Sequence, residues 1–432
     1  LSKSVRTHRI TQFVSMQIKR DTYIQALKAR RHNGLIKVIT GLRRVGKSYL
    51  LFTLFYDYLI HDGVDEDHII KIAFDSLAFG DLADPHALLA YLEERISGKD
   101  WYYLLLDEVQ LLPNFEGVLN ALLYKENIDI YVTGSNAKFL SHDVITEFRG
   151  RGDELHLLPL SFSEFMSASP GKDRYVGLSE YMLYGGLPRI LAMETPERKA
   201  EYLKQLFSET YILDMKKRSH IRYLSQFDRI LDIVASDIGS LTNPHKIKNT
   251  FESVEHSSLS QNTIDRYLRI LEDAFLIKGV QRYDIRGRRY IGSPLKYYFE
   301  DVGLRNARLN FRQSELTYLM ENVIYNELRF RGYNVDVGVV ELYDHSTEKT
   351  RRQRLEIDFV VNSGSKRYYI QSAFSMDSQE KMQQEQRSLQ NTNDNFKKII
   401  VVRDVTLPLR DDSGVTTLSI YDFLLDPHSL DL

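Results

Sequence analysis

Short apolar runs alternate with longer amphipathic stretches between residues 35 and 160. Five of the apolar runs have the length and β-branched content of buried strands: 35–40, 69–74, 101–106, 128–133 and 154–158. Helices are expected over 48–60, 85–96, 116–124 and 138–148. Strands that alternate with helices predict an α/β fold with a mainly parallel sheet covered on both faces. Ligands of such sheets bind at the carboxyl ends of the strands.

The alternation stops after Pro159. Residues 161–225 read as helices with a break at 184–188, and 226–312 as helices followed by a hairpin. From Ser314 the pattern predicts a long helix, several strands, a helix near 378–389, a strand at 398–402 and a last apolar element from Val415. The pattern thus divides the chain into five regions: a basic arm (1–34), an α/β core (35–160), a helical region (161–225), a region of helices with a hairpin (226–312) and a second α/β region (313–432).

The loop after the first predicted strand, 41–48, reads GLRRVGKS and matches GxxxxGK[ST]. Its glycines let backbone N–H groups surround phosphate oxygens, Lys47 supplies a positive charge, and Ser48 can ligate Mg²⁺. The helix that follows adds the positive end of its dipole. The sequence therefore predicts that ATP and Mg²⁺ bind here, with nucleotide contacts from Gly41, Arg43, Arg44, Val45, Gly46, Lys47, Ser48 and Tyr49.

The third predicted strand ends in two adjacent acids, Asp107 and Glu108. Carboxylates at the end of a buried strand are costly unless they have a function. Asp107 is expected to hold Mg²⁺ together with Ser48, and Glu108 to orient or deprotonate the attacking water. Apolar runs that end in Asp-Glu also occur at ordinary strand ends, but after a phosphate loop this pair predicts an ATPase.

Further catalytic candidates lie between the fourth and fifth predicted strands. Asn136, or Ser135 in its place, is expected beside the γ-phosphate, although both are also favoured helix N-caps. Arg151, ahead of Arg149, could neutralise transition-state charge in the same chain or on a neighbour's nucleotide. The alternative for the two arginines is a favourable interaction with a helix dipole beside a glycine cap.

On these residues the chain resembles the AAA+ ATPases, and in particular the prokaryotic group of predicted AAA+ ATPases with a C-terminal domain of unknown function. The resemblance rests on 41–48, the strand ending at 107–108, and the segments 133–136, 150–151, 159–165 and 185–188. It implies ATP and Mg²⁺ binding, an αβα core and a helical lid. It also offers a nucleotide-sensing role for Arg189, with a surface cation as the alternative.

Residues 260–271 begin with cap residues and place Ile264, Leu268 and Leu271 on one helix face, and a basic hairpin follows. Residues 278–312 hold nine Lys or Arg against three Asp or Glu, a local charge of +6. This resembles a winged helix. Contacts with double-stranded DNA would come from Arg266, Arg269, Arg286, Arg288 and Arg289. The alternative is a domain-docking module whose arginines pair with acids of the ATPase domain. In the family that the chain resembles, such a module could also contact another protein.

The last region resembles the restriction-endonuclease-like fold, in which acids on a helix and two strands, with a Lys, hold Mg²⁺ and activate water. By this resemblance Glu321 is the helix acid and Asp358 the strand acid. Gln371 and Ala373 stand where the third acid and the Lys are expected. A neutral amide is a weak ligand for a hard dication and Ala cannot donate, so we expect an inactive nuclease-like domain.

Composition narrows the possible partners and compartments. The 432 residues hold 57 Lys+Arg and 59 Asp+Glu, a formal charge of −2, so a nucleic-acid role must rest on local patches. The absence of Cys excludes disulfides, thiol nucleophiles and Cys-ligated metals. No apolar run reaches the ~18 residues of a membrane span. We expect a cytoplasmic protein without a membrane partner, whose basic N-terminal arm either is solvated or contacts phosphate.

The function expected from these features is that of an ATPase that couples nucleotide binding and hydrolysis to rearrangement of the winged-helix and nuclease-like modules, acting on DNA. One alternative is a slow nucleotide-operated switch or scaffold with a protein partner. A second is an ATP-regulated nuclease. An arginine donated between chains would require an oligomer, which the sequence leaves open.

Overall fold

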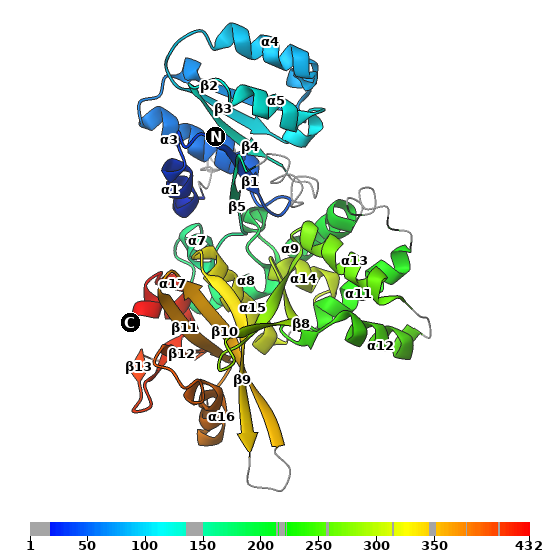
Figure 1. The fold of residues 1–432 in the computed structure, drawn as a ribbon, viewed down its shortest axis with the longest axis vertical. Helices are drawn as coiled ribbons and strands as arrows, with labels where there is room; N and C mark the ends of the chain where they lie inside the picture. The colour runs from blue at the N-terminus through cyan, green and yellow to red at the C-terminus, as the bar shows by residue number, and fades with distance from the viewer. Residues whose placement is uncertain are drawn as a thin grey trace, which may run out of the picture.

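The computed structural model describes residues 18–134, 150–212, 215, 221, 223–255, 259–312, 315–344, 351–376, 378–404 and 407–432. Figure 1 shows a small sheet with flanking helices at one end of the molecule and a second, larger sheet at the other. The lid helices lie between the two sheets, and a group of helices lies beside the larger one (Figure 1).

The first sheet is parallel throughout, as predicted, with the strand order β2-β3-β4-β1-β5. Its strands are β1 (Ile36–Thr40), β2 (Ile69–Ala73), β3 (Tyr102–Asp107), β4 (Ile128–Thr133) and β5 (Gly152–His156). Every residue of β1, β3 and β4 is buried, which explains why these strands are mostly apolar. The two buried charges inside them, Lys37 of β1 and Asp129 of β4, pair with each other. Because β4 lies between β1 and β3, the carboxyl ends of these three strands meet at one edge.

Helices cover both faces of this sheet (Figure 1). They are α1 (Asp21–Ala29), α2 (Lys47–Tyr49), the π-helical η1 (Leu50–Phe55), α3 (Tyr56–His61), α4 (Pro85–Arg95) and α5 (Phe115–Leu122). Short 3-10 turns, η2 (Glu66–His68), η3 (Leu77–Ala83) and η4 (Val109–Leu111), lie between them. The helix predicted over 48–60 is therefore present as three consecutive helical segments. The helix predicted over 138–148 falls outside the described residues.

The basic N-terminal region corrects one expectation. Arg20 donates to the Leu158 carbonyl over 2.6 Å and lies 3.3 Å from Glu164, and it is only 4% exposed. Arg30 pairs with Asp153 at 2.9 Å. These arginines anchor α1 to β5 and to the segment that follows it, because buried guanidinium groups require carboxylate or carbonyl partners. Neither a solvated arm nor a phosphate-contacting arm describes them.

The lid has a helical part on each side of a glycine break. It comprises α7 (Phe162–Ser167), α8 (Arg174–Tyr184), the 3-10 helix η6 (Pro188–Ala192), α9 (Pro196–Gln205) and the π-helical η7 (Leu206–Ile212). Gly185, with φ +76°, ends α8, and a Cβ there would lie 2.3 Å from a carboxylate oxygen of Asp301. The predicted break at 184–188 is thus the place where the lid contacts the C-terminal half.

Three helices and three strands follow in the order of a winged helix: α11 (Leu224–Ser236), β6 (Leu241–Thr242), α12 (Pro244–Glu255), α13 (Gln261–Asp273), β7 (Ile277–Asp284) and β8 (Arg289–Phe299). Both β6 and β7 pair antiparallel with β8. Ser260 caps α13, and Ile264, Leu268 and Leu271 are buried on one face, as predicted.

The remaining elements are α14 (Val302–Arg308), α15 (Leu316–Phe330), β9 (Asn334–Asp344), β10 (Arg351–Ser363), β11 (Lys366–Ala373), α16 (Gln379–Gln390), β12 (Lys397–Val402), β13 (Leu409–Arg410), β14 (Val415–Ser419), α17 (Ile420–Leu425) and η8 (Ser429–Asp431). Strand β7 pairs in parallel with β9, with Tyr283 opposite Gly338. One nine-stranded sheet, in the order β13-β14-β12-β11-β10-β9-β7-β8-β6, therefore runs through both predicted C-terminal regions. The domain boundary that the sequence predicted at 312/313 therefore separates two groups of strands that belong to the same sheet.

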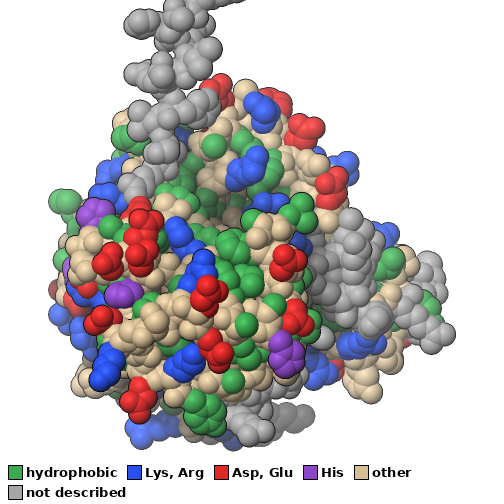
Figure 2. All heavy atoms as spheres, turned by 90° about the horizontal axis from the view of Figure 1, so that it is seen from above, with side chains coloured by type: hydrophobic (Ala, Val, Ile, Leu, Met, Phe, Trp, Pro, Cys, Tyr) green, Lys and Arg blue, Asp and Glu red, His purple; other side chains and the backbone are tan. Residues whose placement is uncertain are grey.

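In the described part of the chain, no helix combines the length and the apolar character needed to cross a membrane. Figure 2 views the molecule from the end that holds the first sheet. On this face, cationic and acidic side chains are intermixed, in keeping with the formal charge of −2.

Candidate nucleotide site

The predicted phosphate loop lies between β1 and α2 and has the backbone of a tight curl. Gly41, Arg44 and Gly46 all have positive φ, at +136°, +66° and +100°. A Cβ on Gly41 would lie 2.2 Å from the Leu157 carbonyl oxygen, so no larger residue fits there. A left-handed conformation at a non-glycine residue such as Arg44 costs about 1–3 kcal/mol and persists where the surroundings require it. Loop 41–48 is therefore held in one specific shape.

Lys47 points into this curl. Its Nζ donates to the carbonyl oxygens of Gly41 (2.9 Å) and Leu42 (3.0 Å), and the side chain is 6% exposed. Burial lowers the pKa of Lys47 to about 8, although the nearby carboxylates of Glu108 and Asp107 oppose the shift. The lysine thus stands at the predicted position, hydrogen-bonded to oxygens that phosphate oxygens would replace.

Asp107 and Ser48 are brought together, as the motif predicted. Asp107 accepts hydrogen bonds from the hydroxyls of Thr133 and Ser48. Burial raises the pKa of Asp107, and these two hydrogen bonds counteract it. A carboxylate beside a hydroxyl is a suitable oxygen set for Mg²⁺, with further oxygens from phosphate and water. Because the described residues contain no cluster of three or more His, Asp or Glu side chains suited to a metal, phosphate would have to complete this set.

Glu108 has a constrained backbone directly after β3. Its φ is +53°, and its backbone N–H donates to Thr133 Oγ1 over 3.2 Å. The amide of Gln110 donates to its carboxylate. Strained residues that their surroundings hold in place are common at active sites. The carboxylate of Glu108 is thereby fixed close to Lys47. Its negative charge counteracts the burial that lowers the pKa of Lys47.

Thr133 is a site residue that the motif analysis missed. It is the last residue of β4, is fully buried, and its hydroxyl contacts both Asp107 and Glu108. The signal available in the sequence was a polar residue at the end of the strand beside β3. The analysis instead selected Asn136 and Ser135, which lie outside the described residues, as does Arg149.

Arg151 does not belong to the phosphate site of its own chain. Its carbonyl accepts from Ile36 at the start of β1, whereas the phosphate loop follows the end of β1. Five residues of a strand separate the two edges, about 16 Å at ~3.3 Å per residue. The guanidinium lies 5.6 Å from the ring centre of Tyr124. The expectation that Arg151 acts in the same chain was therefore wrong, and a role on a neighbour's nucleotide stays a prediction.

The part of the lid at its glycine break, 184–188, lies close to the phosphate loop 41–48. Pro188 Cγ lies 3.9 Å from the position of a Cβ on Gly46. Two arginines, Arg189 of the lid and Arg44 of the phosphate loop, lie near the hydroxyl of Tyr202. Burial raises the pKa of Tyr202, and both arginines counteract that shift. Among the other predicted contacts, Val45 is buried in the core and Tyr49 is 38% exposed.

A hydrogen-bonded series that the sequence did not indicate leads from β1 to the C-terminal half. The hydroxyl of Thr40 lies 3.0 Å from Nδ1 of His156, whose Nε2 lies 2.9 Å from Glu300 Oε1. Arg329 on α15 donates to the same Glu300 oxygen over 3.1 Å. Glu300 is 3% exposed and close enough to raise the pKa of Lys47. The series links the strand before the phosphate loop to β8 and α15.

The predicted nucleic-acid contacts fall into two groups. Arg266 and Arg269 lie on the exposed side of α13, and Arg288 and Arg289 lie exposed at the β7–β8 turn. Arg286 is used within the protein: it donates to the carbonyls of Asn391 (2.9 Å) and Glu341 (3.3 Å). This arginine fastens the hairpin to the neighbouring strand β9 and to the end of α16.

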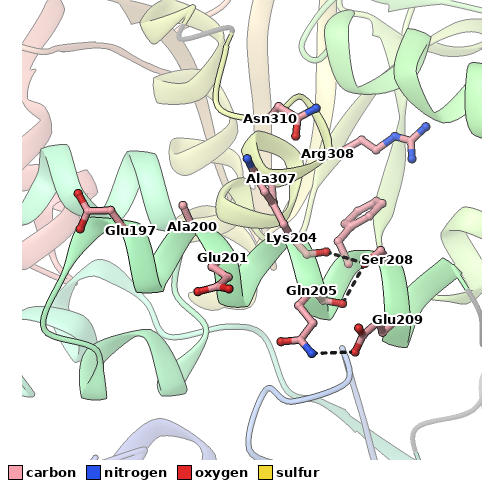
Figure 3. Close-up of a pocket in the computed structure, with 11 residues that line it drawn as sticks. Glu197, Ala200, Glu201, Lys204, Gln205, Ser208, Glu209, Ala307, Arg308 and Asn310 are labelled. Atoms are coloured by element: carbon pink, nitrogen blue, oxygen red, sulfur yellow. Dashed lines mark hydrogen bonds between the residues drawn. The ribbon is translucent and has the colours of Figure 1, made fainter.

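A groove of about 740 Å³ lies between α9, η7 and α14 (Figure 3). Several of its polar side chains are paired with their own surroundings. Ser208 donates to the Lys204 carbonyl (3.0 Å), Gln205 donates to Glu209 (3.0 Å), and Arg308 pairs with Asp232 (2.7 Å). The loop residues 41–48 are absent from its described lining, so this groove is separate from the phosphate site.

Comparisons with known proteins match three consecutive segments of the chain. Residues 33–166 match an AAA domain, 176–315 match a domain of unknown function (DUF8612), and 317–423 match another (DUF4143). A Haemophilus influenzae protein described as uncharacterized is 33% identical over 413 residues, which cover 94% of this chain and 98% of that one. An uncharacterized Methanocaldococcus jannaschii protein, MJ1544, is 27% identical over 79% of this chain and 75% of its own.

Solved structures with some similarity include two described with nucleotide analogues. The Aeropyrum pernix ORC2 protein (ADPNP-ADP complexes) has 12% identity and a TM-score of 0.35, over 60% of this chain and 85% of that one. AMPPCP-bound DnaA from Aquifex aeolicus has 17% identity and a TM-score of 0.29, over 58% and 86%. From the AAA domain at the phosphate loop and the full-length relative, the chain belongs to the family of prokaryotic AAA+ proteins that have a C-terminal domain of unknown function.

Proposed function

We propose that this protein binds ATP with Mg²⁺ at loop 41–48 and hydrolyses it. The observation that carries the proposal is the convergence of Lys47, Asp107 and Glu108 at one edge of the parallel sheet. The Lys47 ammonium would donate to the β- and γ-phosphates in place of the Gly41 and Leu42 carbonyls. The loop amides would hold the remaining phosphate oxygens.

Ser48 and Asp107 are the proposed metal-holding residues, since their oxygens already lie in hydrogen-bond contact. Bound Mg²⁺ would neutralise charge on the phosphates as the terminal bond breaks. Thr133 fixes the Asp107 carboxylate through its hydroxyl. It would thus keep Asp107 oriented whether or not the site is loaded.

Glu108 is the proposed residue that orients the attacking water and accepts its proton. Contacts from Thr133 and Gln110 hold its backbone and carboxylate in place, which favours a defined water position. Asn136 would help to position the same water. Arg151 would act on the nucleotide of a neighbouring chain, so this part of the proposal includes an oligomer.

The work of the ATPase would be a movement of the C-terminal half relative to the core. The lid break contacts Asp301, and the series Thr40–His156–Glu300 joins β1 to the end of β8. Because the winged-helix hairpin and the nuclease-like strands share one sheet, they would move as a single body. A change at the loop would shift this body through Glu300 and Asp301.

The proposed partner of this body is double-stranded DNA, contacted by Arg266 and Arg269 on α13, with Arg288 and Arg289 at the hairpin turn. A second candidate is a slow switch, in which the module docks on a protein partner. Its support is that Arg286, one of the predicted DNA contacts, is used within the protein. The two functions differ in how turnover responds to DNA.

ATP hydrolysis measured with and without duplex DNA separates the two functions. Stimulation by DNA that disappears at high salt supports a DNA-handling ATPase, since phosphate contacts are salt-sensitive. Equal rates with and without DNA, together with slow release of bound ATP, support the switch. The mass in solution with and without nucleotide tests the oligomer in the same preparation.

A further inference from the structure

Three carboxylates converge at one point beside the nine-stranded sheet. Glu356 and Asp358 are two residues apart on β10 and so face the same side of it, and Glu321 reaches them from α15. Acids on a helix and a strand are the arrangement with which the restriction-endonuclease-like fold holds Mg²⁺. Whether a dication fits here depends on what else occupies the point where the carboxylates meet.

The side chain of Lys296, on β8, occupies that point. Its Nζ lies 2.8 Å from Glu321 Oε1, 2.8 Å from Glu356 Oε1 and 3.4 Å from Asp358 Oδ1. The lysine is only 2% exposed. An ammonium has three N–H donors, so one lysine can satisfy one oxygen from each carboxylate.

Further hydrogen bonds hold Glu321 and Asp358 in this arrangement around the ammonium group. Tyr298 donates to Glu321 Oε1 over 2.6 Å, and the backbone N–H of Ser372 donates to Asp358 Oδ2 over 2.8 Å. The side-chain oxygen of Gln371, at the position of the missing third acid, accepts from the Asp358 backbone N–H over 3.3 Å. A Mg²⁺ ion requires about six oxygens in octahedral geometry. The residues present therefore do not fit a divalent cation.

We propose that the ammonium group of Lys296 permanently takes the place of a divalent cation in this nuclease-like site. The cluster is then a structural ion-pair network and not a metal centre, and the domain performs no metal-dependent cleavage of nucleic acid. Lys296 comes from the winged-helix hairpin, whereas its three partners come from α15 and β10. The network therefore also fastens the winged helix to the nuclease-like part. This inference is independent of ATP hydrolysis at loop 41–48.

Binding of Mn²⁺ to the nucleotide-free full-length protein tests the proposal in its native state. Free Mn²⁺ is titrated by electron paramagnetic resonance into the wild type and into Asp358→Asn. The proposal expects the same Mn²⁺ binding in both proteins, because no ion enters the cluster. A binding site that the wild type has and Asp358→Asn lacks would overturn it.

Lys296→Ala tests the same claim by removing the substitute cation. The variant is expected to be less stable than the wild type, because three carboxylates lose their buried partner. It should also gain a Mn²⁺ site, and saturating Mn²⁺ should raise its melting temperature by about 2–4 °C. The matched control is Lys366→Ala, whose lysine pairs with Asp431 at 3.0 Å on the exposed surface.

A folded Lys296→Ala protein that gains no Mn²⁺ binding relative to Lys366→Ala would contradict the substitution of a cation by lysine. If Lys296→Ala does not fold, the comparison of wild type with Asp358→Asn still decides the question. Failure of ATP binding in the same preparations would affect only the proposed function.

Discussion

Nε2 of His156 lies 2.9 Å from Oε1 of Glu300, although 144 positions separate the two residues in the sequence. His156 ends β5 and also contacts Thr40, the last residue before the phosphate loop. Glu300 directly follows β8, which belongs to the nine-stranded sheet. The contact therefore joins the edge of the first sheet beside the phosphate loop to the C-terminal half. We propose that this half moves when ATP is bound and hydrolysed.

Replacing Glu300 by Gln should destabilise the protein. The variant leaves His156 and Arg329 without their carboxylate, and breaking a buried ion pair on one side costs about 3–5 kcal/mol. Burial raises the pKa of Glu300, but His156 and Arg329 outweigh it and hold the pKa below its ordinary value. The stabilisation from this group is therefore present above the unfolded-state pKa and lost as pH falls through the folded value.

Urea unfolding of the Glu300→Gln variant at pH 7 and at pH 4 checks this expectation. The difference in the free energy of unfolding between wild type and variant should shrink at the lower pH. Glu201→Gln, at an exposed position on α9, is the control and should change little. Equal stability of wild type and Glu300→Gln at pH 7 would show that the contact contributes nothing.

Glu108→Gln should bind ATP like the wild type but lose turnover. The amide cannot accept a proton, and general-base catalysis typically contributes about 10²–10⁴-fold to a rate. Steady-state hydrolysis and equilibrium binding of ATP measure the two effects separately. Glu126→Gln, an exposed residue on the loop before β4, should keep full turnover. A Glu108→Gln protein with wild-type turnover would remove this residue from catalysis.

Thr133→Val should impair the same site without changing the shape of the side chain. The variant removes the acceptor for the Glu108 backbone N–H and the donor to Asp107. Leaving a buried donor without a partner costs about 1–3 kcal/mol. We expect turnover to fall about tenfold or more, which corresponds to ~1.4 kcal/mol. Thr133→Ser keeps the hydroxyl and should restore most of the rate, and a Val variant as active as the Ser variant would refute the role.

Arg266→Ala combined with Arg269→Ala tests the DNA-contacting face of α13. If each arginine contacts one phosphate, the double variant should lower the slope of log affinity against log salt by about 2. Fluorescence anisotropy with a labelled duplex at several salt concentrations measures this slope. Arg95→Ala, on exposed α4 of the core, is the control. An unchanged slope would place DNA, if it binds, on another surface.

Local patterns in the sequence were sufficient for the first sheet and for the phosphate loop. The buried strands β1, β3 and β4 are short, mostly apolar runs, and loop 41–48 has a motif whose spacing is set by phosphate chemistry. The place of Asp107 could also be predicted locally, because a charged residue at the end of an apolar run is easily recognised in the sequence. Each of these signals lies within a few residues of the chain.

The features that the sequence missed depend on contacts between distant residues. The parallel pairing of β7 with β9 joins two regions that read as separate domains. Glu300 and Lys296 are ordinary charged residues in a strand pattern, and their partners lie elsewhere in the chain. The place of Arg151 in the fold was missed for a similar reason, since closeness to a motif in sequence did not show at which end of the sheet it lies.

The central claim is that loop 41–48 binds a nucleoside triphosphate through Lys47, and isothermal titration calorimetry with ATP and Mg²⁺ tests it most directly. Because burial lowers the pKa of Lys47 to about 8, binding of the anionic phosphates should favour the protonated lysine, with uptake of protons near that pH. Affinity should therefore fall as pH rises above about 8, by up to about tenfold per pH unit.

The titration is made at pH 7 and pH 9 with wild type and Lys47→Ala. The account predicts clear binding heat for the wild type at pH 7, weaker binding at pH 9, and loss of binding in Lys47→Ala at both pH values. A folded wild-type protein that gives no heat with ATP and Mg²⁺, or a Lys47→Ala variant that binds as tightly as the wild type, would contradict it.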